Sequence, residues 1–194
     1  TLLINIFLFA LIIFTMSTLI FLYSAHKEDM SVMDIAYGPL FAIGAWSAIV
    51  ITDGYYPLTL LVATLITLWA VRLGVRIWRK NHGKPEDARY AAWRQAWTRQ
   101  GRQYFLRRSY LQVNLFQGLI ICIIALPFIV TLSAGDAHGT WYTAAGTLLM
   151  LFGLAYETIA DWQLDAFLAR KCAGTEPSPI MTTGLFLYSR RPNY

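Results

Sequence analysis

Residues 2–23 read LLINIFLFALIIFTMSTLIFLY, an apolar run without a single charged side chain. At about 1.5 Å per residue, a helix of this length crosses the roughly 30 Å hydrocarbon core of a bilayer. A cleaved signal peptide would have a basic start and a shorter apolar core, so the run predicts a transmembrane helix. The whole chain agrees, since 57% of it is hydrophobic and 14% charged, against about 25% charged in ordinary soluble domains.

Four further segments have the same character, and together they predict an all-α, polytopic transmembrane helical bundle with five spans. They run over about residues 35–51, 57–78, 111–132 and 141–161. Pro39 and Pro127 predict kinks in two of them, because proline lacks a backbone donor and clashes with the preceding turn. The chain begins inside an apolar run and ends inside a motif. We therefore expect residues 1–194 to form one transmembrane domain, incomplete at both ends, of a protein with about seven spans.

Basic residues are concentrated between the third and fourth apolar segments. Residues 79–108 hold nine Lys and Arg but only two acidic residues, Glu86 and Asp87. Residues 52–56 and 133–140 hold no Lys or Arg. The positive-inside rule therefore places 79–110 and the C-terminal motif in the cytoplasm and the N-terminus outside. The net charge of +5 then indicates a membrane face and no nucleic-acid partner. We expect a bacterial inner membrane, or the endoplasmic reticulum in a eukaryote.

The basic loop has internal order. Tyr90, Trp93, Trp97 and Tyr104 follow one another at helical spacing, with Arg89 off the aromatic stripe. This pattern predicts an amphipathic helix that lies in the headgroup layer of the membrane. The alternative is a lid over a cofactor site, with its arginines on phosphates.

Charged residues at the ends of apolar segments are candidates for ligand binding. Arg72 and Arg76 share a helix face and would either reach the headgroups or clamp an anionic cofactor. Glu157 and Asp161 share a face at the inner end of the last segment, where a carboxylate is costly unless it faces a cavity or a partner. Carboxylates suit ribose hydroxyls or a carboxamide, and arginines suit phosphates. The combination predicts a nucleotide cofactor.

Three other polar residues lie near apolar segments. Gln117, early in the fourth apolar segment, would either face a polar cavity or form a hydrogen bond to a neighbouring helix. Asp34 and Tyr37, three residues apart, would supply an acid and a hydroxyl donor, or else a helix cap and an interfacial aromatic residue. The sequence has no G-x-G-x-x-G after a strand and no P-loop, so helices and loops would have to hold a nucleotide. The separated cysteines and histidines show no metal-site spacing.

Several stretches together resemble a known family. They are EDARY at 86–90, FQG at 116–118 followed by Leu126-Pro127, YETIADWQ at 156–163 and GLFLYSRRPNY at 184–194. They resemble the steroid 5-alpha-reductase-like membrane family, including its bacterial members of unassigned function. Family members typically read G-L-W-x-Y-S-R-H-P-N-Y-F-G-E at the last stretch, so Arg191 stands where histidine is usual.

The resemblance implies a bundle that binds NADPH from the cytoplasmic side and reduces the carbon–carbon double bond of an enone, such as a 3-oxo-4-ene steroid. Glu157, Asp161, Arg190, Asn193 and Tyr194 would line the cofactor site. Hydride would move to the enone while a protein donor stabilises the developing enolate oxygen.

By the same resemblance, Asp34 or Tyr37 would polarise the substrate carbonyl. An apolar substrate would enter from the surrounding membrane lipids. Two alternatives stay open at this point. One is an S-adenosylmethionine-dependent membrane methyltransferase of the isoprenylcysteine or phospholipid type, which carries an R-H-P-x-Y motif. The other is a lipid-binding or scaffolding bundle without catalysis.

Overall fold

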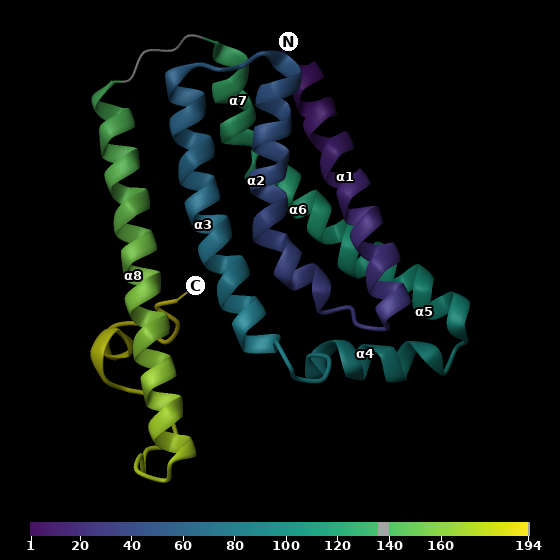
Figure 1. The fold of residues 1–194 in the computed structure, drawn as a ribbon, viewed down its shortest axis with the longest axis vertical. Helices are drawn as coiled ribbons and strands as arrows, with labels where there is room; N and C mark the ends of the chain where they lie inside the picture. The colour runs from purple at the N-terminus through teal and green to yellow at the C-terminus, as the bar shows by residue number, and fades with distance from the viewer. Residues whose placement is uncertain (136–139, 194) are drawn as a thin grey trace. The chain divides into compact units, whose positions relative to one another are not determined.

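The computed structural model of the protein describes residues 1–135 and 140–193, and its regular elements over these ranges are all helical (Figure 1). The prediction of an all-α bundle is confirmed. In chain order the elements are α1 (Leu2–Lys27), α2 (Val32–Thr52), α3 (Pro57–Asn81), α4 (Ala88–Thr98), α5 (Arg102–Arg108), the π-helix η1 (Ser109–Leu115), α6 (Phe116–Ile124), α7 (Leu126–Ala134), α8 (Trp141–Cys172) and the 3-10 turn η2 (Gly184–Leu187).

The membrane-length helices match the predicted spans. Among the described residues, α1, α2, α3 and α8 are each long and apolar enough to cross a membrane. The helix over 102–124 and α7 make a fifth span if they count as one bent unit. The chain therefore has the helices of an integral membrane protein. Each helix extends beyond the apolar run that predicted it, most of all α8, which ends at Cys172.

The predicted kink at Pro127 is present. Between Ile124 and Leu126 the helix axis bends by 46°. Pro127 stands in the first turn of α7, where its missing N–H would otherwise bond to the carbonyl of Ile123 and its ring would clash with that turn. By contrast, α2 continues as a helix through Gly38 and Pro39.

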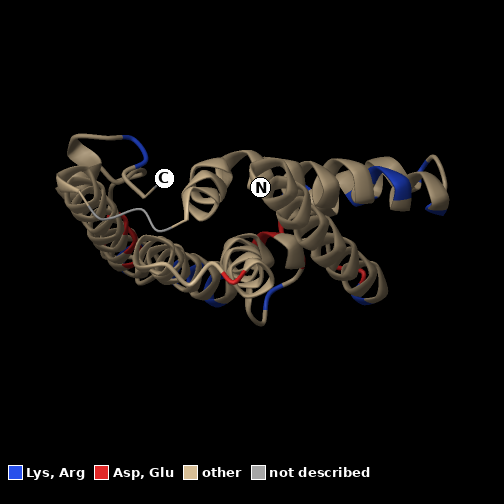
Figure 2. Ribbon diagram, turned by 90° about the horizontal axis from the view of Figure 1, so that it is seen from above, with Lys and Arg blue, Asp and Glu red and all other residues tan. Residues whose placement is uncertain are grey.

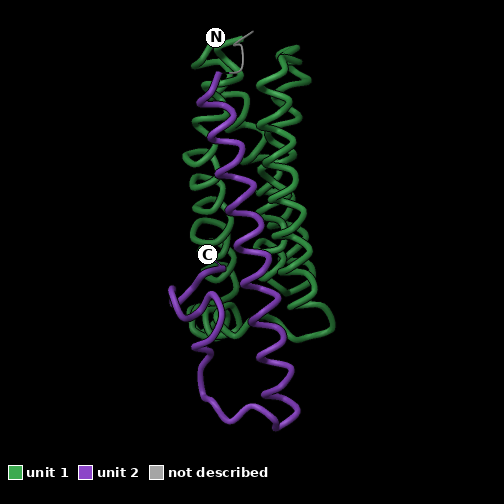
Figure 3. The backbone as a smooth tube through the Cα atoms, turned by 90° about the vertical axis from the view of Figure 1, so that its left-hand side faces the viewer, with its two compact units in different colours: residues 1–138 green, residues 139–194 purple. Residues whose placement is uncertain are grey.

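The chain divides into two compact units, residues 1–138 and 139–194 (Figure 3). In unit 1, α2 packs against both α1 and α3. The approach to α3 is close because small residues meet there: a Cβ on Gly38 would lie 2.9 Å from the Ala70 carbonyl oxygen. On the other side, a Cβ on Gly44 would lie 2.8 Å from the Phe9 ring. Packing of this kind suits helices in lipid, where close van der Waals contact drives association.

Polar side chains link the helices of unit 1 across this core. Asn5 on α1 donates to Ser133 on α7 at 2.8 Å. The hydroxyls of Thr18 and Tyr110 lie 3.0 Å apart. These bonds join α1 to the bent pair of helices over 102–124 and 126–134, which we call the broken span. A polar group in an apolar interior is stable only when it is hydrogen-bonded.

The basic loop of unit 1 is mostly helical, as predicted, although the aromatic stripe is divided. Helix α4 ends at Thr98, and α5 begins after Gly101, whose φ of 104° suits glycine. Trp93 and Trp97 therefore stack on one helix, with ring centroids 5.5 Å apart, while Tyr104 lies on the next. The interruption at Gly101 was not visible in the spacing of the aromatic residues.

An ion pair within this loop also forms hydrogen bonds to the turn between α1 and α2. The Arg94 guanidinium donates to both carboxylate oxygens of Glu86 at 2.9 Å, and it also donates to the carbonyl of Glu28. The Met30 N–H donates to Glu86 Oε1 at 2.8 Å. Arg94 also lies over the Phe105 ring. The α1–α2 turn and the basic loop consequently lie at the same end of unit 1 (Figure 1).

Unit 2 consists of α8 and the C-terminal segment folded back along it. Lys171 Nζ donates to the Pro179 carbonyl at 2.6 Å. The Leu185 N–H donates to Gln163 Oε1 at 2.9 Å. Gly184 adopts a φ of 63°, and a Cβ there would lie 2.5 Å from the same Gln163 oxygen. Glycine at this position thus allows the terminal motif to pass close to α8.

Candidate functional site

The carboxylate of Asp34, at the start of α2, accepts hydrogen bonds from two other parts of unit 1. The Tyr90 hydroxyl donates to Oδ1 at 2.5 Å, and Arg89 Nη2 donates to Oδ2 at 3.0 Å. Gln117 Nε2 lies 3.3 Å from Oδ1 and 3.5 Å from the Tyr90 oxygen. We call these four residues the Asp34 cluster. It brings together Asp34, Arg89 and Gln117, which were predicted as site residues on separate grounds.

Local structure places Asp34 and Arg89 of this cluster. Asp34 lies in the first turn of α2, where a negative charge is favourable against the helix dipole. Asp87 caps α4 by accepting the Arg89 N–H at 3.0 Å, and the same oxygen accepts Arg89 Nε at 3.0 Å. The cap therefore fixes both the start of α4 and the direction of the Arg89 side chain. Tyr90, the next residue, lies in the first turn of the same helix.

The electrostatics of the cluster keep Tyr90 protonated. Tyr90 is only 4% exposed. Burial, followed by the hydrogen bond to Asp34, raises the pKa of its phenol well above the ordinary value. The hydrogen bond to Asp87 raises the pKa of Arg89. Since the Arg89 side chain is 66% exposed, it offers a cation at the surface while its Nη2 balances the partly buried carboxylate of Asp34.

Two buried amide oxygens on the helix that carries Gln117 lack hydrogen-bond partners within the described part of the chain. They are Oε1 of Gln117 and Oδ1 of Asn114. Four buried hydroxyls are in the same state, those of Ser17, Ser24, Thr59 and Ser109. Asn114 is fully buried in the π-helix, where its Nδ2 donates to the Ser17 carbonyl at 3.3 Å. An unsatisfied buried acceptor costs about 1–3 kcal/mol, and π-helical segments occur often at functional sites. The arrangement fits a bound group that carries N–H or O–H donors.

A second polar contact lies in unit 2 and involves the terminal motif. Asn193 Nδ2 donates to Asp161 Oδ1 at 2.9 Å, and the Asp161 side chain is buried against it. Arg190 and Arg191 are exposed, and the Arg191 N–H donates to Ser189 Oγ at 3.3 Å. The motif is thus folded onto α8 with its asparagine inward and its arginines outward.

The other predicted site residues are placed as follows. Arg72 and Arg76 lie one turn apart on α3, and Glu157 is half-buried on α8. Tyr37 packs its ring edge-on against Phe41, with centroids 5.5 Å apart. Tyr194 lies outside the described residues.

Tyr90 is the member of the Asp34 cluster that sequence analysis placed elsewhere. Its helical spacing to Trp93 predicted a membrane-facing aromatic residue, and the two rings do meet edge-on at 5.5 Å. Its position directly after Arg89, within the EDARY stretch at 86–90, was a signal for it, but the contact with Asp34 joins residues 56 apart in sequence.

Residues 20–194 match the model of a family described as "Protein of unknown function (DUF1295)". The chain belongs to the DUF1295 family. The match includes both the Asp34 cluster and the contact between Asp161 and Asn193. No curated protein matches the chain, and no solved structure does.

Proposed function

We propose that this DUF1295 protein is an NADPH-dependent membrane reductase that acts on the carbon–carbon double bond of an apolar enone. The observation that carries the proposal is the Asp34 cluster, in which a buried, neutral phenol lies beside a carboxylate whose charge is balanced by Arg89. The resemblance of residues 156–163 and 184–194 to steroid 5-alpha-reductase-like proteins supports the choice of cofactor. A bundle of apolar helices suits a substrate that dissolves in lipid.

Tyr90 is the proposed hydrogen-bond donor to the substrate carbonyl. When an enone is reduced, negative charge develops on its carbonyl oxygen, and a positioned donor stabilises that charge. Asp34 accepts from Tyr90, Gln117 and Arg89, so it orients the phenol and is not itself the donor. Because a phenol carries one proton, Tyr90 would turn that proton from the Asp34 carboxylate to the carbonyl oxygen when the substrate binds. The raised pKa of Tyr90 keeps its proton available across physiological pH.

Asp34 and Gln117 would have positioning roles. Asp34 fixes the phenolic oxygen at 2.5 Å. Gln117 lies within reach of both the carboxylate and the phenol, and its own Oε1 is left without a partner among the described residues. A hydroxyl or amide donor on a bound ligand would satisfy that oxygen. This assignment favours Tyr90 over Tyr37, because the Tyr90 hydroxyl bonds to Asp34.

The groups that each unit presents fit the chemistry of a dinucleotide. Phosphates require cations, which the exposed Arg89 in unit 1 and the exposed Arg190 in unit 2 can supply. Ribose hydroxyls and a carboxamide require acceptors and amides, and Asp161 and Asn193 are of those types. Arg190, Asp161 and Asn193, all of unit 2, would hold NADPH, which when bound supplies a hydride.

A pair of tyrosine variants tests the proposal. The detergent-purified full-length protein would be given NADPH and a 3-oxo-4-ene steroid as the probe enone, and the reduced product would be measured by mass spectrometry. We expect Tyr90→Phe to lower kcat by about 10²–10³, the loss typical of one oxyanion donor, with NADPH affinity unchanged. Tyr37→Phe is the matched control and should stay near the wild-type rate. Equal activity of Tyr90→Phe and wild type would refute the role given to Tyr90.

A further inference from the structure

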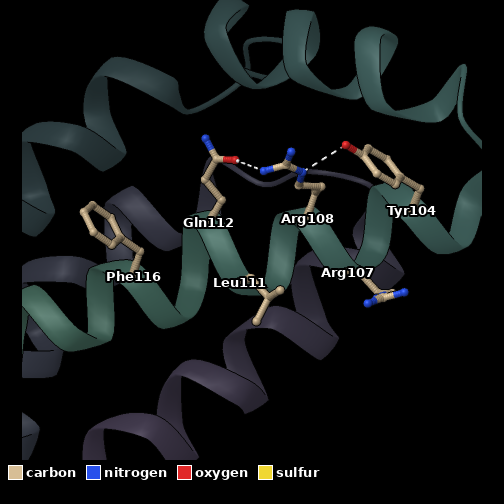
Figure 4. Close-up of a pocket in the computed structure, with 6 residues that line it drawn as sticks. All are labelled: Tyr104, Arg107, Arg108, Leu111, Gln112 and Phe116. Atoms are coloured by element: carbon tan, nitrogen blue, oxygen red, sulfur yellow. Dashed lines mark hydrogen bonds between the residues drawn. The ribbon is translucent and has the colours of Figure 1, made fainter.

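The helix that enters the broken span carries a surface hollow on the side away from the core. The hollow has a volume of about 650 Å³ (Figure 4). Its lining comes entirely from the segment 104–116, and we call it the Arg108 groove. It is lined by Tyr104, Arg107, Arg108, Leu111, Gln112 and Phe116.

The helical repeat separates this groove from the core of unit 1. Phe105, Ser109 and Val113, spaced by four, are buried. A second row has the same spacing of four and is shifted by one residue along the chain from the buried row. It consists of Tyr104, Arg108, Gln112 and Phe116, and Figure 4 shows its polar members on one side of the helix. The groove residues are therefore set apart from the buried face by the repeat itself.

The Arg108 guanidinium is held in place by its neighbours. Its Nε donates to the Tyr104 hydroxyl at 3.0 Å, and its Nη1 lies 3.4 Å from Gln112 Oε1 (Figure 4). It also lies over the Tyr104 ring, 5.6 Å from the centroid. Arginine has five N–H donors in a planar fork. These contacts therefore orient the group and leave donors for an anion.

The chemistry of the groove changes along the helix. Arg107 and Arg108 provide two adjacent exposed cations; together with Arg102 they give α5 its positive charge, coloured blue in Figure 2. Leu111, one turn beyond Arg107, is 55% exposed, and Phe116, two turns beyond Arg108, is 56% exposed. Cations next to exposed apolar side chains, at the point where a helix becomes apolar enough to enter a bilayer, match a molecule with an anionic head and an apolar tail.

We infer that the Arg108 groove binds an anionic phospholipid. Arg108, which lies on the same side of the helix as Tyr104 and Gln112 (Figure 4), would contact the headgroup phosphate, to which guanidinium groups form charge-assisted bonds. Arg107 points to the other side and would add positive charge beside the headgroup, and Phe116 would contact the upper part of an acyl chain. Basic pockets at the cytoplasmic ends of membrane helices are suited to such headgroups. This inference does not depend on the proposed reductase activity.

Native mass spectrometry of the full-length protein in detergent tests the inference, with phosphatidylglycerol as the anionic probe and phosphatidylcholine as the zwitterionic one. The test variant is Arg107→Gln with Arg108→Gln. The matched control is Arg79→Gln with Lys80→Gln, which removes an adjacent exposed pair of the same charge from the end of α3.

We expect wild type to prefer phosphatidylglycerol. The test variant should bind it about 30-fold more weakly, the change that corresponds to roughly 1 kcal/mol for each of two arginines. The control variant should stay near wild type. A variant with Arg108→Lys keeps the charge and loses the planar fork. It should lose part of the affinity even if the double variant folds poorly.

Three results would overturn the inference. The first is equal binding of the two lipids by wild type, the second is a loss of affinity in the control as large as in the test variant, and the third is displacement of phosphatidylglycerol by inorganic phosphate at equal concentration. The last result would identify the groove as a site for a free anion.

Discussion

Replacing Glu86 with glutamine should release the basic loop from the α1–α2 turn. The Glu86 carboxylate accepts two bonds from Arg94, each at 2.9 Å, and one from the Met30 N–H at 2.8 Å. Glutamine has nearly the same shape but only one acceptor oxygen and no charge. Arg94 would then keep its contact with the Phe105 ring and lose its counter-ion.

The size of the effect follows from burial. The side chains of Glu86 and Arg94 are 13% and 23% exposed, so the pair lies between a surface pair and a fully buried one. Breaking a buried pair costs about 3–5 kcal/mol, whereas an exposed pair contributes about 0–1 kcal/mol. We expect Glu86→Gln to lower the free energy of local opening by about 2–3 kcal/mol, which is about 30- to 150-fold in an opening equilibrium.

Hydrogen exchange followed by mass spectrometry measures this opening directly. Peptides that cover residues 28–33 and 88–98 should exchange faster in Glu86→Gln by the factor given above, because the Met30 N–H loses its acceptor. The matched control is Glu176→Gln, whose partner Arg170 is 50% exposed at 3.4 Å. That variant should leave both peptides unchanged. Unchanged exchange of 28–33 in Glu86→Gln, or equal acceleration throughout α1 and α2, would refute the proposal of a local clamp.

Three further predictions concern stability. Gly38→Ala should destabilise the protein by about 1–3 kcal/mol because the new Cβ would lie 2.9 Å from the Ala70 carbonyl oxygen, whereas Gly146→Ala, with no atom within 4 Å, should not lower the unfolding temperature. Asp87→Ala should cost about 1 kcal/mol and speed exchange at the start of α4, because the cap of that helix is lost. Raising the pH above 10.0, the ordinary pKa of tyrosine, should destabilise wild type more than Tyr90→Phe: the folded-state pKa is raised, so stability is complete below that pH and is lost as the pH rises. Thermal unfolding of both proteins from about pH 8 to 11 checks this, and parallel curves would contradict it.

The helices could be predicted from sequence because their causes are local. An apolar run of membrane length specifies a span wherever it occurs, as residues 2–23 do for α1. The bend near Pro127 follows from the chemistry of one residue. The positions at which the helices end were less predictable. Polar residues after Asp161 extend α8 to Cys172, and Gly101 divides the aromatic stripe.

The Asp34 cluster could not be assembled from the sequence, although three of its residues were predicted separately. Asp34 lies 56 residues from Tyr90 and 83 from Gln117, and a spacing pattern carries no information across such distances. The π-helix before Gln117 does not show in the apolar pattern of residues 111–132. Tyr90 was assigned to the membrane surface because an aromatic residue at helical spacing is compatible with either a lipid-facing or a buried position.

Cofactor binding is the most direct test of the proposed function. NADPH, NADH and S-adenosylmethionine would be titrated into the detergent-purified full-length protein, with energy transfer from the native tryptophans for the nicotinamides and calorimetry for all three. We predict saturable binding of NADPH that Arg190→Gln weakens and that Arg170→Gln, a matched exposed arginine of unit 2, leaves unchanged. Binding of S-adenosylmethionine alone would instead identify a methyltransferase, and a folded protein that binds none of the three would contradict the proposal of an enzyme.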